Sequence, residues 1–90
     1  MTSHRDEVGP APRLLVVDDE RPIREMLELG LQGRGFEVRS VADGQAAIPL
    51  IQEWKPELIL LDVMLPKVDG IAMLPMLRRL TEAPIVMLSA

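Results

Sequence analysis

Three acidic side chains stand directly after short apolar runs of the sequence. Asp18 and Asp19 follow "LLVV" (14–17), and Asp62 follows "LILL" (58–61). Clustered carboxylates repel one another, so a group of three favours a hard dication, and Mg²⁺ with carboxylate and water ligands fits. A dication would also keep Asp62 ionised and able to act as a nucleophile. This pattern indicates a metal or phosphate site.

The elements that must position these acids are strands. Continuous apolar runs at 14–17, 58–61 and 85–88 are typical of strands buried on both faces of a parallel sheet. The run at 36–41 carries charges, which suit an edge strand. Ligands bind beyond the carboxyl ends of such strands, so the three acids converge if the first and third strands are neighbours. Ser89 ends the fourth run, and we expect its hydroxyl to face the same crevice.

Helical periodicity fills the gaps between the strands. Apolar residues spaced three or four apart predict helices over 20–33, 43–54 and 70–80. The resulting order, β-α-β-α-β-α-β, predicts an α/β fold with right-handed crossovers.

Three residues bear on where the predicted helices begin. Asp43 is a candidate N-cap, because its side chain can accept a hydrogen bond from the first helical turn. Pro49 and Pro75 fall inside predicted helices, where a proline removes a backbone hydrogen bond. These two helices either bend or begin later than drawn. Because their apolar stripes persist through both prolines, we keep both helices and expect local distortion.

Composition excludes several classes of protein. The 90-residue chain is 48 % hydrophobic, has a net charge of −4 and has no cysteine, so disulfides and cysteine-based metal sites are excluded. A reducing compartment fits, and no apolar run reaches membrane-spanning length. Arg78 and Arg79 are the only paired bases, which a solvated helix face explains, so we expect no direct nucleic-acid binding.

The first twelve residues, "MTSHRDEVGPAP", are polar and hold acids and prolines. They lack the apolar stretch of a signal peptide, so we predict a disordered leader over 1–12 and a cytoplasmic protein. His4 lies in this leader, where we expect no ligand role.

Three motifs together resemble the receiver domain of two-component response regulators. "LLVVDDE", "LLDVMLPKVDG" and "PIVMLSA" occur in that family's order and at about its spacing, over about residues 13–90. The wording "DVMLP" is most like regulators whose receiver precedes a winged-helix DNA-binding domain. The resemblance implies a flavodoxin-like doubly wound parallel sheet and a signalling module rather than an enzyme.

The resemblance also implies a role for each site residue. Asp62 would be the phosphoacceptor, receiving a phosphoryl group from a sensor histidine kinase or a small phosphodonor. Asp19 would bind Mg²⁺ directly with Asp18 assisting, and the Met64 main-chain carbonyl would be a third protein ligand. Ser89 would be the switch hydroxyl that bonds a phosphoryl oxygen. Such a site works by positioning and by charge neutralisation.

The sequence departs from the family pattern after Ser89. The family fold continues with a helix, a fifth strand whose lysine pairs with the phosphoryl group, and a last helix, and none of these occurs in the 90 residues. Lys55 and Lys67 do not match that lysine. We therefore expect a C-terminally truncated, partial receiver with impaired phosphorylation. The uncharged run at 85–88 then becomes an edge, which predicts self-association through it.

Other functions remain open at this point. A receiver fragment could act as a protein-interaction or dimerisation module that never takes a phosphoryl group. A haloacid-dehalogenase-like phosphatase also uses an aspartate nucleophile and Mg²⁺, but that family carries a D-x-D motif after its first strand. Here Asp18 and Asp19 are adjacent, and Asp62 is followed by Val63 and Met64. Dinucleotide binding is disfavoured because "GRG" (33–35) follows a helix rather than a strand.

Overall fold

The computed structural model describes residues 10–62 and 71–88 of the chain. Strands and helices alternate along this part of the chain, in the order predicted from the sequence. They are β1 (Arg13–Val17), α2 (Arg21–Gln32), β2 (Glu37–Val41), α3 (Gly44–Glu53), β3 (Leu58–Asp62), α4 (Leu74–Leu80) and β4 (Ile85–Leu88). Among the described residues, no helix is long and apolar enough to span a bilayer.

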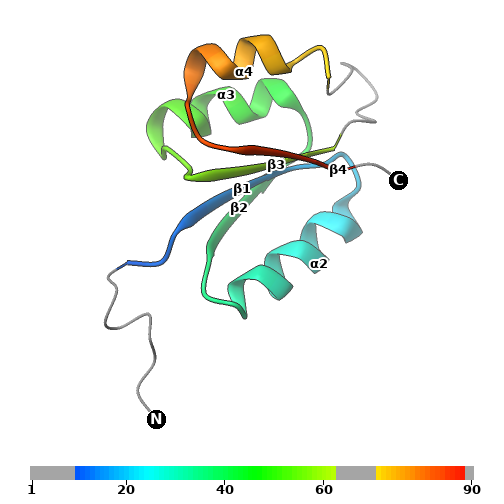
Figure 1. Ribbon diagram of the computed structural model, residues 1–90. Coiled ribbons are helices and arrows are strands. Elements are labelled where there is room, and N and C mark those ends of the chain that lie inside the picture. Colours follow the sequence, from blue (N-terminus) through cyan, green and yellow to red (C-terminus); the bar gives the residue numbers. More distant parts are fainter. Residues whose placement is uncertain (1–9, 63–70, 89–90) are drawn as a thin grey trace.

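The four described strands form one parallel sheet in the order β2-β1-β3-β4. Helices α3 and α4 cover one face of this sheet, and α2 covers the other (Figure 1). The flavodoxin-like doubly wound arrangement predicted from the sequence is therefore confirmed. The charged strand β2 lies at an edge, as its composition predicted.

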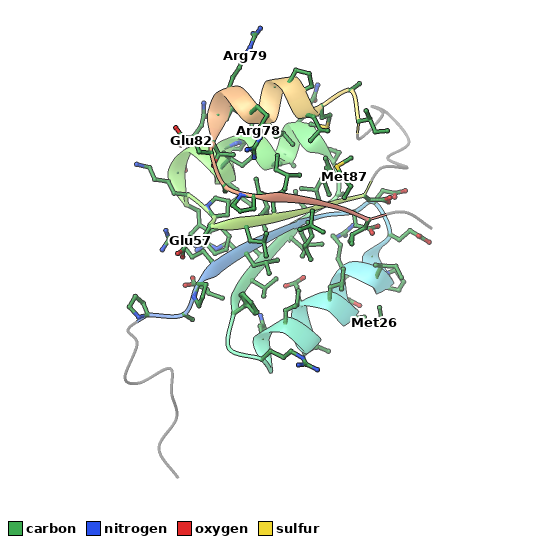
Figure 2. The ribbon with its side chains drawn as sticks, in the orientation of Figure 1. Met26, Glu57, Arg78, Arg79, Glu82 and Met87 are labelled. Atoms are coloured by element: carbon green, nitrogen blue, oxygen red, sulfur yellow. The ribbon has the colours of Figure 1, made fainter. Side chains whose placement is uncertain are left out.

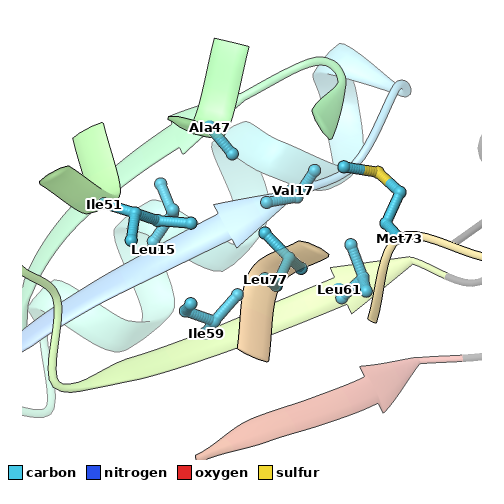
Figure 3. Packing of buried hydrophobic residues seen from close by; sticks show 8 residues of the cluster. All are labelled: Leu15, Val17, Ala47, Ile51, Ile59, Leu61, Met73 and Leu77. Atoms are coloured by element: carbon cyan, nitrogen blue, oxygen red, sulfur yellow. The ribbon is translucent and has the colours of Figure 1, made fainter. Parts of the chain in front are cut away.

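Strand β1 is buried on both faces because helices flank it on both sides. Leu15 and Val17 pack towards α3 and α4, while Leu14 and Val16 pack towards α2. Figure 3 shows the larger of the two cores, which joins β1 and β3 to α3 and α4. Its buried members are Leu15, Val17, Ala47, Ile51, Ile59, Leu61, Met73 and Leu77.

Helix α2 is held less deeply than α3. None of its residues is fully buried, although Leu27 and Leu31 pack against Leu14, Val16 and Val38. Two large apolar side chains on its outer side are exposed, Met26 at 60 % and Leu29 at 73 %. Met26 lies on the opposite side of the sheet from Met87, which faces α4 (Figure 2).

The predicted N-cap is confirmed, and the prolines act in two different ways. The Asp43 carboxylate accepts a hydrogen bond from the Ala46 N–H at 2.8 Å. Pro49 lies inside α3, so that helix continues through it. Helix α4 begins at Leu74 rather than at residue 70, because Pro75 then occupies the first turn, where a backbone N–H needs no partner. The sequence prediction was wrong on that start.

The end of β1 nearer the N-terminus is fastened by Arg13. Its guanidinium donates to the Lys55 carbonyl through Nε at 3.1 Å and Nη2 at 3.0 Å, and its main-chain N–H donates to Glu57. Lys55 has a φ of 57°, the left-handed conformation that ends α3. Before this strand, the Pro12 carbonyl accepts from the Glu37 N–H, and residues 1–9 of the predicted leader, His4 included, lie outside the described residues.

Gly44, at the start of α3, packs against the side chain of Met73, the residue before α4. A Cβ at Gly44 would overlap the Cε and Sδ atoms of Met73, which is itself only 3 % exposed. We expect Gly44→Ala to lower the free energy of unfolding by about 1–3 kcal/mol, as overpacking of a core does. Urea unfolding followed by circular dichroism measures this change.

Gly30 provides the matched control for that substitution. It also lies in a helix, but no atom lies within 4 Å of an added Cβ. Gly30→Ala should therefore raise the free energy of unfolding by about 0.5–1 kcal/mol through helix propensity alone. Equal effects of the two substitutions would contradict the tight contact between Gly44 and Met73.

Candidate functional site

The site is built by the parallel register of β1 and β3. Val17 pairs with Leu61, so Asp18, the next residue on one strand, stands level with Asp62, the last residue of the other. Asp19 follows in the turn towards α2. One carboxylate oxygen from each of the three aspartates lies within 4.8 Å of the other two. The structure thus brings together the three acids that the sequence singled out.

Asp18 is held in place by three hydrogen bonds. Its N–H donates to the Val41 carbonyl at 3.1 Å, which continues the pairing of β1 with β2 by one residue. Its Oδ1 accepts from the Glu20 N–H at 2.9 Å, an Asx-type turn that leads into α2. Its carbonyl accepts from Arg24 Nη1 at 2.7 Å. Asp18 is 5 % exposed and is the most buried of the three aspartates.

The three carboxylates differ in their access to solvent. Asp18 is buried, Asp62 is half-buried and Asp19 is exposed. A hydrated cation could therefore enter from the side of Asp19 and keep several of its waters. Mg²⁺ commonly binds in this way, through one or two carboxylates and several water molecules.

The donor set fits a hard dication. Carboxylate oxygens from three residues supply the ligand type and the negative charge that Mg²⁺ or Ca²⁺ prefers. Two further predicted site residues, Met64 and Ser89, lie outside the described residues. The described pairing of β3 with β4 ends at Asp62 and Leu88.

Lys55, the lysine within the described residues, lies away from the acidic site. The Lys55 carbonyl receives the Arg13 side chain at the start of β1, whereas the aspartates follow the end of that strand. Lys55 is therefore at the opposite end of the strands from the aspartates. Lys67 lies outside the described residues.

Arg24 is a site residue that the sequence reading missed. It lies in α2, six positions beyond Asp18, and its half-buried guanidinium contacts the backbone of the acidic turn. A signal was present, because an arginine one turn into a helix can reach back to the loop before that helix. Nothing in the interspersed charges distinguished Arg24 from Arg21 as the arginine that contacts this turn.

The fold and the acids define the class of protein. A doubly wound parallel sheet with carboxylates beyond its central strands is an α/β protein with an acidic ligand site at its switch point. The family model of the response regulator receiver domain matches residues 14–90. The chain therefore belongs to the response regulator receiver family.

Solved structures show the same relationship. A response regulator from Burkholderia pseudomallei, determined with a phosphorylated aspartic acid, a calcium ion and citrate, is 30 % identical with a TM-score of 0.81. The structure of the response regulator protein TrrA in complex with histidine kinase ThkA matches with 34 % sequence identity and a TM-score of 0.80. NtrX from Brucella abortus, in complex with ADP, matches with 36 % sequence identity and a TM-score of 0.82.

These matches cover most of this chain but less of the others. The comparison with the Burkholderia regulator covers 87 % of this chain and 46 % of that one. The ThkA–TrrA match covers 88 % of this chain and 69 % of that one, and the NtrX match covers 88 % and 19 %. The chain thus spans less than half of the Burkholderia regulator.

The acidic cluster predicts that stability depends on divalent cations. Asp19→Asn removes one of three neighbouring negative charges, so without divalent cations it should raise the free energy of unfolding by up to about 1 kcal/mol. Wild-type stability should rise with added Mg²⁺, by about 2.7 kcal/mol at one hundred times the dissociation constant, and the variant should gain less. Urea unfolding with and without MgCl₂ measures both effects.

Glu53→Gln is the control, because it removes the same charge from an exposed residue outside the acidic cluster, at the C-terminal end of α3. It should leave the response to Mg²⁺ unchanged. Equal stabilisation of wild type and Asp19→Asn by Mg²⁺ would contradict a metal site at these aspartates.

Proposed function

We propose that this chain is a phosphoacceptor module of two-component signalling, in which Asp62 accepts a phosphoryl group beside a bound Mg²⁺. The observation that carries the proposal is the meeting of Asp18, Asp19 and Asp62 within 4.8 Å at the ends of β1 and β3. The Burkholderia relative holds a phosphorylated aspartic acid and a calcium ion, a hard dication like Mg²⁺.

The proposed chemistry is an in-line transfer to a carboxylate oxygen. An oxygen of Asp62 forms the new bond to phosphorus. The bond that breaks leaves its electron pair on the donor atom, which is the bridging oxygen of an acyl phosphate or the imidazole nitrogen of a phosphohistidine. Asp18 and Asp19 would hold Mg²⁺, which neutralises the charge that the carboxylates and the phosphoryl group bring together. The Met64 carbonyl and the Ser89 hydroxyl complete the proposed site.

The donor in this proposal is a sensor histidine kinase or a small acyl phosphate. Support comes from the relative TrrA, which was solved in complex with the histidine kinase ThkA. We propose a cytoplasmic module, since the absence of cysteine suits a reducing compartment. The sequence "DVMLP" favours an output domain of the winged-helix DNA-binding class in the whole regulator.

Phosphorylation of Asp62 is tested with acetyl phosphate and Mg²⁺, followed by intact mass spectrometry. We expect one phosphoryl adduct per chain, none in Asp62→Asn, and a strong reduction when the Mg²⁺ is chelated. No adduct on the wild-type chain would contradict the proposal.

The same experiment separates the module from an enzyme. We propose stoichiometric phosphorylation rather than turnover, so acetyl phosphate consumption should stop near one equivalent apart from slow hydrolysis of the adduct. Rapid consumption of many equivalents would favour a phosphatase with an aspartate nucleophile.

A second candidate function, self-association, is favoured by the outer edge of β4. In the described part of the sheet, β4 pairs with β3 alone, and the sequence 85–88 carries no charge. Val86 is 45 % exposed on this strand. An apolar edge without a charge or a bulge pairs readily with another strand. We therefore propose that two copies pair through β4.

Sedimentation equilibrium tests this pairing. Val86→Lys places a charge on the apolar edge, so it should shift the wild-type dimer towards monomer by about tenfold or more in dissociation constant. Glu37→Lys, on the exposed edge strand β2, is the control and should leave assembly unchanged. A wild-type chain that sediments as a monomer would contradict the pairing.

A further inference from the structure

Arg24 joins α2 to the acidic turn. Its half-buried guanidinium donates from Nη1 to the Asp18 carbonyl at 2.7 Å. We propose that Arg24 is a positioning residue for the metal site, because it fixes the peptide between Asp18 and Asp19 and so the direction of the Asp19 carboxylate. The inference rests on the proposed divalent-cation site, and it assigns a role that the three acids alone do not require.

The Asp18 carbonyl is the right atom for this purpose. Its oxygen belongs to the peptide that links Asp18 to Asp19, so a bond to it restrains ψ of the first residue and φ of the second. The Asp18 N–H is already held by Val41 and its Oδ1 by the Glu20 N–H. Arg24 thus restrains the one part of the turn that aims Asp19.

The position of the Asp19 carboxylate depends on its backbone more than the positions of the other two carboxylates do. Asp18 is buried and Asp62 belongs to a strand, whereas Asp19 is exposed and lies in the turn before α2. An exposed side chain in a turn has more conformational freedom to lose when it binds a cation. Holding its peptide in advance therefore strengthens binding.

Charge and geometry predict opposite effects on Mg²⁺ affinity when Arg24 is removed. A guanidinium near a dication repels it, so removal of the charge alone would tighten Mg²⁺ binding. Removal of the restraint on the peptide would weaken it. Solvent and salt screen the repulsion at an open site, whereas the restraint acts through a direct bond, so we expect the second effect to be larger.

The test is isothermal titration calorimetry of the full chain with MgCl₂, for wild type, Arg24→Met, Arg24→Lys, Arg21→Met and Asp19→Asn. Methionine keeps much of the apolar stem but cannot donate, while lysine keeps the charge and a donor. Arg21 lies in the same helical turn, but its side chain pairs with Glu25 at 3.2 Å, so its loss controls for net charge. Urea unfolding without Mg²⁺ reports the stability of each variant.

We expect Arg24→Met to bind Mg²⁺ about tenfold more weakly, equivalent to about 1.4 kcal/mol. Arg24→Lys should recover at least half of that loss on a logarithmic scale, and Arg21→Met should bind like wild type. At saturating Mg²⁺, acetyl phosphate should label Arg24→Met at close to the wild-type rate, because the defect lies in metal affinity.

Four results would overturn the role of Arg24. Tighter binding by Arg24→Met would show that charge repulsion dominates. Unchanged binding, with or without a loss of stability, would show that Arg24 only anchors α2. If Arg24→Met does not fold, Arg24→Lys decides, since an affinity as weak as that of Asp19→Asn would exclude the restraint. Absence of Mg²⁺ binding by the wild-type chain would instead remove the metal site itself, and this role with it.

Discussion

The parallel pairing of β1 with β3 is the interaction on which the rest of the structure depends. It places Asp18 level with Asp62, and the meeting of these two carboxylates follows from that alignment. Each residue of a parallel strand advances the chain by about 3.3 Å, so a slip of two residues would move the acids about 7 Å further apart. No single ion could then contact both. The register of an apolar sheet is in this sense the first determinant of its polar chemistry.

The register itself is fixed by burial on two faces. Leu14 and Val16 pack towards α2, and Leu15 and Val17 pack towards α3 and α4. A slip of one residue would exchange the two sets, which fill cores of different size and shape. The side chains that specify the fold and those that define the site are therefore consecutive in the sequence, and neither set can shift without the other.

Much of this was readable from the sequence, for identifiable physical reasons. Uninterrupted apolar runs bounded by polar residues predicted the strands and their order. Burial on both faces holds for β1, whereas β3 alternates buried and half-buried residues and β4 has no fully buried residue. Asp43 was recognisable as an N-cap because its hydrogen bond is local. The convergence of Asp18 with Asp62 needed one assumption about strand order, and the sheet satisfies it.

The remainder depends on contacts that a one-dimensional pattern does not contain. The start of α4 at Leu74 follows from where Pro75 can be accommodated, and an apolar stripe does not mark that position. Lys55 adopts a positive φ because the end of α3 requires it, although its side chain does not favour that conformation. Arg24 and Arg21 look alike in the sequence and differ only in what lies within reach.

Helix α2 has a consequence for local stability. It has no fully buried residue, and a hydrogen bond from Ser40 to Glu28 and the bond from Arg24 to the Asp18 carbonyl are among its few polar ties to the sheet. Helices held in this way open more often than those seated in a core, so its amide protons should exchange faster than those of α3. Opening of α2 would release Arg24 from the Asp18 carbonyl. A molecule that bound the exposed side of α2 and displaced this helix would change the acidic site without touching a carboxylate.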